Sequence, residues 1–114
     1  MAGEYEARDW LQKKVFYDTV KLERNIVQAR DGGADIYCKP FVVEVKRCEK
    51  LQFDNWWIQV NRAAKESELI PVVMFRQNTK PWDFLISAQQ IGCKSGWLHI
   101  SQVSFIRWSK QYVL

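Results

Sequence analysis

The N-terminal segment has the apolar periodicity of an amphipathic helix. Between residues 3 and 17 the apolar side chains recur at spacings of three and four, which gathers them on one side of an α-helix; they are Ala7, Trp10, Leu11 and Val15. Glu4 falls on the same line, three residues before Ala7. A carboxylate on the buried side of a helix needs a reason, such as a metal ion or a partner, so Glu4 is a candidate ligand. Glu6 is expected to point away from this line, together with Lys13.

Two strand-like segments follow around a short turn. Residues 35–38 and 41–46 flank Lys39-Pro40, and the second segment is rich in the β-branched and aromatic residues that favour strands. A hairpin turn centred on Lys39-Pro40 sets Asp35 directly opposite Glu44, and directly opposed residues share a face of the sheet. We therefore expect a β-hairpin with both carboxylates on one face.

The remaining elements are strands and one further helix. A loose alternation over residues 21–27 indicates a strand ahead of the hairpin, and Asp54 as N-cap begins a helix that ends before Leu69. Further strands are expected at 71–76, 82–87, 98–103 and 105–108, the last two on weaker patterns. This order, αβββαββ, predicts an α/β fold with a mixed sheet flanked by helices. No linker divides residues 1–114, so we expect one domain.

Composition narrows the class of protein without identifying it. The chain has 114 residues, 47% of them hydrophobic, and 17 Lys and Arg against 13 Asp and Glu give a net charge of +4. These values exclude a disordered or fibrous chain, and the positive charge is a weak bias towards nucleic acid. The sequence contains no apolar run that would cross a bilayer and no signal-peptide pattern at its N-terminus, so we expect a cytoplasmic protein.

Cysteine, histidine and tryptophan add little chemistry. Three cysteines without a CxxC pair and a single histidine, His99, are too few soft ligands for a zinc site, and we expect reduced, structural thiols. Trp56, Trp57 and Trp82 lie close to basic residues, where an indole can stack on a nucleic-acid base. The alternative is that these large side chains fill a small core.

The hairpin carries the candidate chemistry. The period of two along a strand adds Lys46 to the face that holds Asp35 and Glu44, so two carboxylates and an ammonium converge. Two close carboxylates repel unless a cation lies between them, and hard oxygen ligands without His or Cys suit Mg²⁺ or Mn²⁺. A lysine beside such an ion can orient or help deprotonate the attacking water in phosphodiester hydrolysis. The alternative is a solvated strand face with a cross-strand ion pair.

These residues resemble the motif of a known nuclease family. Gly33-Ala34-Asp35-Ile36 followed by Val43-Glu44-Val45-Lys46-Arg47 is similar to the PD-(D/E)XK nuclease motif, in the form found in the phage and archaeal Holliday junction resolvase branch. Members of that branch carry a further glutamate on a helix near the N-terminus, which Glu4 matches. The resemblance covers residues 3–87 and departs at Ala34, where proline is usual, and residues 88–114 contain no recognised motif.

The resemblance implies a restriction-endonuclease-like α/β core in the order αβββαβ. Asp35, Glu44 and the carbonyl of Val45 would hold a divalent metal, Mg²⁺ or Mn²⁺. Lys46 would position the attacking water, and Glu4 would be an outer or second-metal ligand.

The resemblance also implies contacts around this site. Gln59, on the helix after the hairpin, would line the site, with a solvent-exposed helix position as its alternative. A set of basic residues flanks the motif and would meet DNA phosphates: Arg24, Arg30, Arg47, Lys50, Arg62, Arg76 and Lys80.

The function that the resemblance implies is a Mg²⁺-dependent endonuclease acting on branched DNA, like a Holliday junction resolvase, in phage DNA recombination. One site cuts one strand, so resolving a two-fold symmetric junction predicts a homodimer. The alternatives are a phage nicking or double-strand endonuclease with the same chemistry and a non-catalytic DNA-binding module. The presence of Asp35, Glu44 and Lys46 together argues against the non-catalytic module.

Overall fold

A computed structural model describes residues 2–19, 34–47 and 49–113 of the chain, with side chains from Tyr5 onward. The strand expected at 21–27 lies outside the described residues, as do Arg24 and Arg30. The elements are α1 (Ala2–Lys14), β1 (Ile36–Cys38), β2 (Phe41–Arg47), α3 (Phe53–Ser67), β3 (Ile70–Arg76), β4 (Asp83–Ser87), the 3₁₀ helix η1 (Ala88–Ile91), β5 (Trp97–Ser101) and α4 (Gln102–Ser109).

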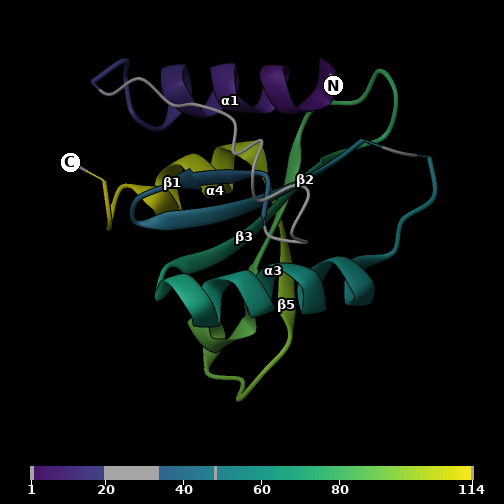
Figure 1. Ribbon diagram of the computed structural model, residues 1–114, viewed down its shortest axis with the longest axis vertical. Coiled ribbons are helices and arrows are strands. Elements are labelled where there is room, and N and C mark those ends of the chain that lie inside the picture. Colours follow the sequence, from purple (N-terminus) through teal and green to yellow (C-terminus); the bar gives the residue numbers. More distant parts are fainter. Residues whose placement is uncertain (1, 20–33, 48, 114) are drawn as a thin grey trace.

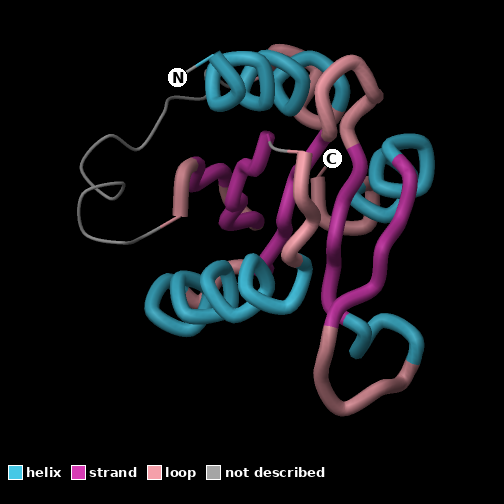
Figure 2. The backbone as a smooth tube through the Cα atoms, turned by 90° about the vertical axis from the view of Figure 1, so that its right-hand side faces the viewer, coloured by secondary structure: helices cyan, strands magenta, loops and turns pink. Residues whose placement is uncertain are grey.

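The strands form one mixed sheet in the order β1-β2-β3-β4-β5. Strands β2 and β3 are parallel and are connected by α3, whereas the other neighbouring pairs are antiparallel. Helices α1 and α3 cover opposite faces of the sheet, as Figures 1 and 2 show. The predicted α/β fold with a mixed sheet flanked by helices is confirmed.

The hairpin has the register that the sequence predicts. Ile36 pairs with Val43 and Cys38 with Phe41, around a turn at Lys39 and Pro40. Extending this register by one residue sets position 35 opposite position 44. The alternation of apolar and polar residues is enough to predict this register, because a slip of one residue would turn the buried side chains of the hairpin towards the wrong face.

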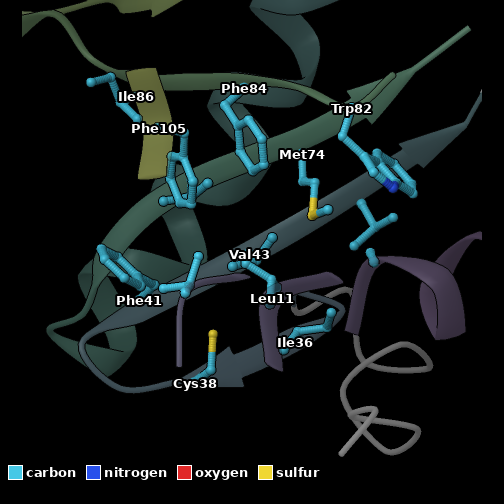
Figure 3. Close-up of a cluster of buried hydrophobic side chains, with 14 of the residues drawn as sticks. Leu11, Ile36, Cys38, Phe41, Val43, Met74, Trp82, Phe84, Ile86 and Phe105 are labelled. Atoms are coloured by element: carbon cyan, nitrogen blue, oxygen red, sulfur yellow. The ribbon is translucent and has the colours of Figure 1, made fainter. Parts of the chain in front are cut away.

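A separate core packs on each face of the sheet. Helices α1 and α4 cover the first face, where Phe105 stacks on Phe84 with ring centroids 3.9 Å apart (Figure 3). Helix α3 covers the second face. Trp56 and Trp57 are buried beneath it and Trp82 is buried in the first core. These three indoles therefore fill the interior, and the interpretation as base-stacking residues is wrong for them.

Two expected features differ from the structure. The N-cap of α3 is Gln52 rather than Asp54, which lies in the first turn and accepts a hydrogen bond from Trp97 Nε1 at 2.8 Å. Residues 105–108 belong to α4 rather than to a strand, because the Ser101 hydroxyl caps that helix by accepting from the backbone N–H of Ser104. None of the described helices is long and apolar enough to cross a membrane.

Candidate active site

The motif residues meet at one edge of the sheet. The carboxyl ends of the parallel strands β2 and β3 lie at this edge, and the antiparallel β1 begins there. Asp35 directly precedes β1, and its Oδ2 accepts a hydrogen bond from the backbone N–H of Val45 at 2.7 Å. This bond joins the two halves of the motif across ten positions of sequence.

Strand alternation divides the neighbouring motif residues between the two faces. Val43 and Val45 point into the core under α1, so Glu44 and Lys46 point to the face that α3 covers. Glu44 is buried, with only 4% of its surface exposed, whereas Lys46 and Asp35 are partly exposed. The structure therefore brings Asp35, Glu44 and Lys46 to one face, as expected from the sequence.

The backbone carbonyl of Val45 adds an oxygen on the side of β2 where Asp35 lies. In an antiparallel pair, the N–H and C=O of one residue point to the same neighbouring strand. Since the Val45 N–H points to Asp35, the Val45 carbonyl is also directed towards the β1 side of the strand.

These donors fit a hard divalent cation. Mg²⁺ is typically held by one or two carboxylates, together with waters and substrate phosphate oxygens. Asp35, the buried Glu44 and the Val45 carbonyl are oxygen donors of this type. No cluster of three or more His, Cys, Asp or Glu side chains suited to a metal occurs within the described residues.

Glu4 lies in the first turn of α1, and its side chain is outside the described residues. Ala7 and Leu11, which share its line along the helix, are both fully buried. The position of Glu4 on the core-facing side is thus consistent with the pattern in the sequence. Its role as a metal ligand stays a prediction.

The expectation that Glu6 points away is wrong. Its carboxylate contacts two arginines at the end of the sheet: Oε1 accepts from Arg47 Nη1 at 3.3 Å and Oε2 accepts from Arg76 Nη2. The sequence contained an indication of this, because Glu6 lies four residues before the core-packed Trp10 and hence on the same side of the helix. The core-facing side of α1 is wider than the single line drawn from the sequence.

Arg76 is held from two sides. Its guanidinium lies over the ring of the buried Trp82, with Cζ 4.8 Å from the ring centroid, while Glu6 accepts its hydrogen bond. Arg76 is thus engaged in packing as well as in an ion pair, which does not match the expectation of a simple phosphate contact.

The other expected contact residues are more peripheral. Gln59 is exposed on α3, and no contact among the described residues connects it to the motif. Arg62 and Lys80 are exposed, and Lys50 is exposed with a contact of its own. A contribution of Gln59 to the site stays a prediction.

Neither of the two described cysteines supplies a nucleophile to the motif. Burial raises the pKa of the Cys38 thiol from 9.0 to about 12, so the thiol stays protonated at neutral pH. Cys93 is an exposed free thiol in the segment between η1 and β5, away from the motif, and Cys48 lies outside the described residues.

A hollow of about 590 Å³ lies at the opposite end of α3 from the motif. Its walls include Asn61, Lys65, Ile70, Ser87 and Gly96. Because it contains none of the motif residues, the concave surface and the candidate chemistry are separate features of the fold.

Comparisons with known proteins agree with this geometry. Residues 3–111 match the family model described as "Phage putative PDDEXK endonuclease", so the match extends well beyond residue 87, through the segment in which no motif was recognised. No curated protein sequence matches. The structure is similar to that of Hjc from Archaeoglobus fulgidus, a Holliday junction resolvase from an archaeal hyperthermophile, with a TM-score of 0.59 and 18% sequence identity over 90% of this chain and 87% of that one. The chain belongs to the phage PDDEXK endonuclease family, and is a nuclease with a restriction-endonuclease-like fold.

Proposed function

We propose that the protein is a Mg²⁺-dependent endonuclease that hydrolyses phosphodiester bonds in branched DNA. The observation that carries the proposal is the contact between the Asp35 carboxylate and the Val45 backbone, which sets Asp35 beside the strand bearing Glu44 and Lys46. The similarity to the resolvase fold supports the choice of a branched substrate.

In this proposal, Asp35, Glu44 and the Val45 carbonyl hold the divalent ion, Mg²⁺ or Mn²⁺, and Glu4 is an outer ligand. The ion, when bound, lowers the pKa of a water and offsets the negative charge that develops on the phosphate. The carboxylate of Asp35 is kept in place by the Val45 N–H. A fixed carboxylate needs little reorganisation during the reaction, which is the main advantage of a preorganised site.

Lys46 acts on the substrate from the same face. Its ammonium has three donors and no acceptor, so it orients the attacking water by donating to the water oxygen and stabilises a phosphate oxygen as negative charge grows. The water oxygen forms the new P–O bond and releases a proton to solvent, while the bond to the departing deoxyribose oxygen breaks and that oxygen takes a proton from solvent. Gln59 would contact the DNA at the margin of the site.

Resolving a four-way DNA junction requires two coordinated cuts. A Holliday junction has approximate two-fold symmetry, and a C2 homodimer presents one site to each of two strands. Exposed aromatic side chains available for an interface include Tyr17 and Tyr112. Light scattering with and without junction DNA tests this part of the proposal: a dimer is expected, and a strict monomer in both conditions would favour a nicking endonuclease.

A panel of DNA substrates tests the proposal as a whole. Linear, flapped, forked and four-way DNA are incubated with the protein in Mg²⁺, and in EDTA as the control. We expect cleavage of the four-way junction in Mg²⁺ and none in EDTA. Equal cleavage of linear duplex would contradict junction selectivity, and cleavage that persists in EDTA would contradict metal dependence.

A further inference from the structure

Two arginines stand side by side at the edge of the sheet that carries the candidate active site. Arg47 and Arg76 are the last residues of β2 and β3 and are partners in the parallel register. Like charges directly opposite each other on neighbouring strands destabilise a sheet. The pair is therefore favourable only with anions close by.

Glu6 supplies one negative charge against these two positive ones. Its two oxygens accept one hydrogen bond from each guanidinium, which leaves an excess of one positive charge in this cluster of three residues. A guanidinium carries five N–H donors, and among the contacts of the described residues the bond to Glu6 uses one of those on Arg47. Arg47 thus keeps donors for a further anion.

Burial separates the roles of the two arginines. The side chain of Arg76 is 20% exposed, lies over Trp82, and has a buried Nε atom without an acceptor among the described residues. The side chain of Arg47 is 43% exposed. Arg76 is therefore the inner partner that anchors Glu6, and Arg47 is the outer partner that a ligand can reach.

We propose that Glu6 is a positioning residue that holds Arg47 for contact with the DNA phosphate next to the one that is cut. The inference rests on the proposed function, because it requires DNA at this edge of the sheet. Lys46 and Arg47 are consecutive and point to opposite faces, so a DNA strand crossing the edge meets both. A guanidinium matches the geometry of a phosphate, and a side chain held in advance loses less freedom on binding.

The test compares two substitutions that remove the same charge. A fluorescent four-way junction is titrated in EDTA at several salt concentrations with wild-type protein, Glu6→Gln and Glu66→Gln. Glu66 is an exposed carboxylate near the far end of α3. Loss of a negative charge alone strengthens DNA binding, so Glu66→Gln is expected to bind as tightly as the wild type or more tightly. Glu6→Gln is expected to bind about fivefold more weakly, because Arg47 loses its orientation.

Arg47 variants show whether Glu6 acts through this residue. Arg47→Ala is expected to weaken binding on the order of tenfold and to reduce the slope of log affinity against log salt by about 1. Arg47→Lys should keep the slope and recover part of the affinity, since the charge remains without the planar fork. Adding Glu6→Gln to Arg47→Ala should cause no further loss of affinity.

Thermal unfolding keeps the structural role of Glu6 separate. Its contact with Arg76 predicts a lower Tm for Glu6→Gln in the presence and absence of Arg47 alike.

The inference is overturned if Glu6→Gln binds like Glu66→Gln, or if it weakens binding equally without Arg47. A wild-type protein that binds the junction but cuts no DNA in Mg²⁺ would instead overturn the proposed function and leave the binding result standing. A protein that neither binds nor cuts DNA would overturn both.

Discussion

The two faces of one sheet edge carry opposite chemistry. On the face under α3, Asp35 and the buried Glu44 lie with one basic residue, Lys46, so negative charge is in excess. On the face under α1, Arg47 and Arg76 share Glu6, and positive charge is in excess. The change of face occurs between two consecutive residues, Lys46 and Arg47, because side chains alternate along a strand.

This contrast bears on the metal-dependent cleavage that we propose. Carboxylates that hold a cation repel the DNA backbone, whose binding depends on basic side chains. Alternation allows β2 to supply carboxylate oxygens to one face and a guanidinium to the other within four residues, Glu44 to Arg47. We infer that the residues for cleavage and the residues for DNA binding lie on opposite faces of the sheet, at the same edge.

Substitution of the consecutive residues Lys46 and Arg47 should have the largest effect and should separate cleavage from DNA binding. Lys46→Ala is expected to lower the rate of cleavage at saturating protein by about 100-fold or more, because it removes a group that acts on the reacting water. Arg47→Ala should leave that saturated rate within about threefold and weaken binding instead. Single-turnover cleavage with increasing protein measures both quantities. Equal rate losses for the two variants would contradict the division between faces.

Removing a core ring on the α1 face should affect stability rather than chemistry. Phe105 is fully buried and stacks on Phe84, so Phe105→Ala is expected to cost about 3–5 kcal/mol of unfolding free energy. Urea unfolding measures this loss, with the exposed Val103→Ala on the same helix as the matched control. A loss below about 1 kcal/mol would show that α4 contributes little to the core.

The inner arginine should behave as a structural residue. Arg76→Ala removes the anchor of Glu6 and the packing over Trp82, and we expect a loss of about 2 kcal/mol in unfolding free energy. Arg47→Ala should cost less than about 1 kcal/mol, because its side chain is more exposed. Urea unfolding of the two variants gives the comparison, and the reverse order would exchange the roles assigned to the arginines.

Alkaline pH provides a smaller test of the α1-face core. Burial raises the pKa of the Cys38 thiol from 9.0 to about 12. Above pH 9 the thiol ionises in the unfolded chain but stays protonated in the folded one. The stability that the buried thiol contributes is therefore complete below pH 9 and is lost as the pH rises towards 12. Between about pH 9.5 and 11, wild-type protein should lose roughly 1.4 kcal/mol per pH unit more than Cys38→Ala. Urea unfolding across this range measures it, with Cys93→Ala as the exposed control; parallel curves for wild type and Cys38→Ala would contradict the burial effect.

The sequence predicted the hairpin and the motif well because both depend on local rules. A two-residue turn and strict alternation determine which residues share a face, and these fix Asp35 relative to Glu44 before any tertiary contact is considered. The parallel pairing of β2 with β3 follows from the crossover helix between them. The order of five strands was consistent with that pattern but depends on packing across the whole sheet.

What the sequence did not predict depends on tertiary contacts. The sequence pattern directs Glu6 to the solvent, because its arginine partners are 41 and 70 positions away and are brought near it only by the fold. Residues 105–108 resemble a strand in sequence because a short apolar segment has no distinct period. In the structure they form part of a helix that Ser101 caps. The sequence predicts Asp54 as an N-cap, yet its carboxylate accepts a hydrogen bond from Trp97 Nε1.

Cleavage by metal-site variants tests the central claim most directly. Asp35→Asn and Glu44→Gln, with Glu66→Gln as the control, are compared by single-turnover cleavage of a four-way junction in Mg²⁺ and by binding to the same DNA. The account predicts that both motif variants lose cleavage and bind DNA as well as or better than wild type, because repulsion of phosphate falls, while Glu66→Gln cuts normally. Cleavage at the wild-type rate by either motif variant would contradict the assignment of this site.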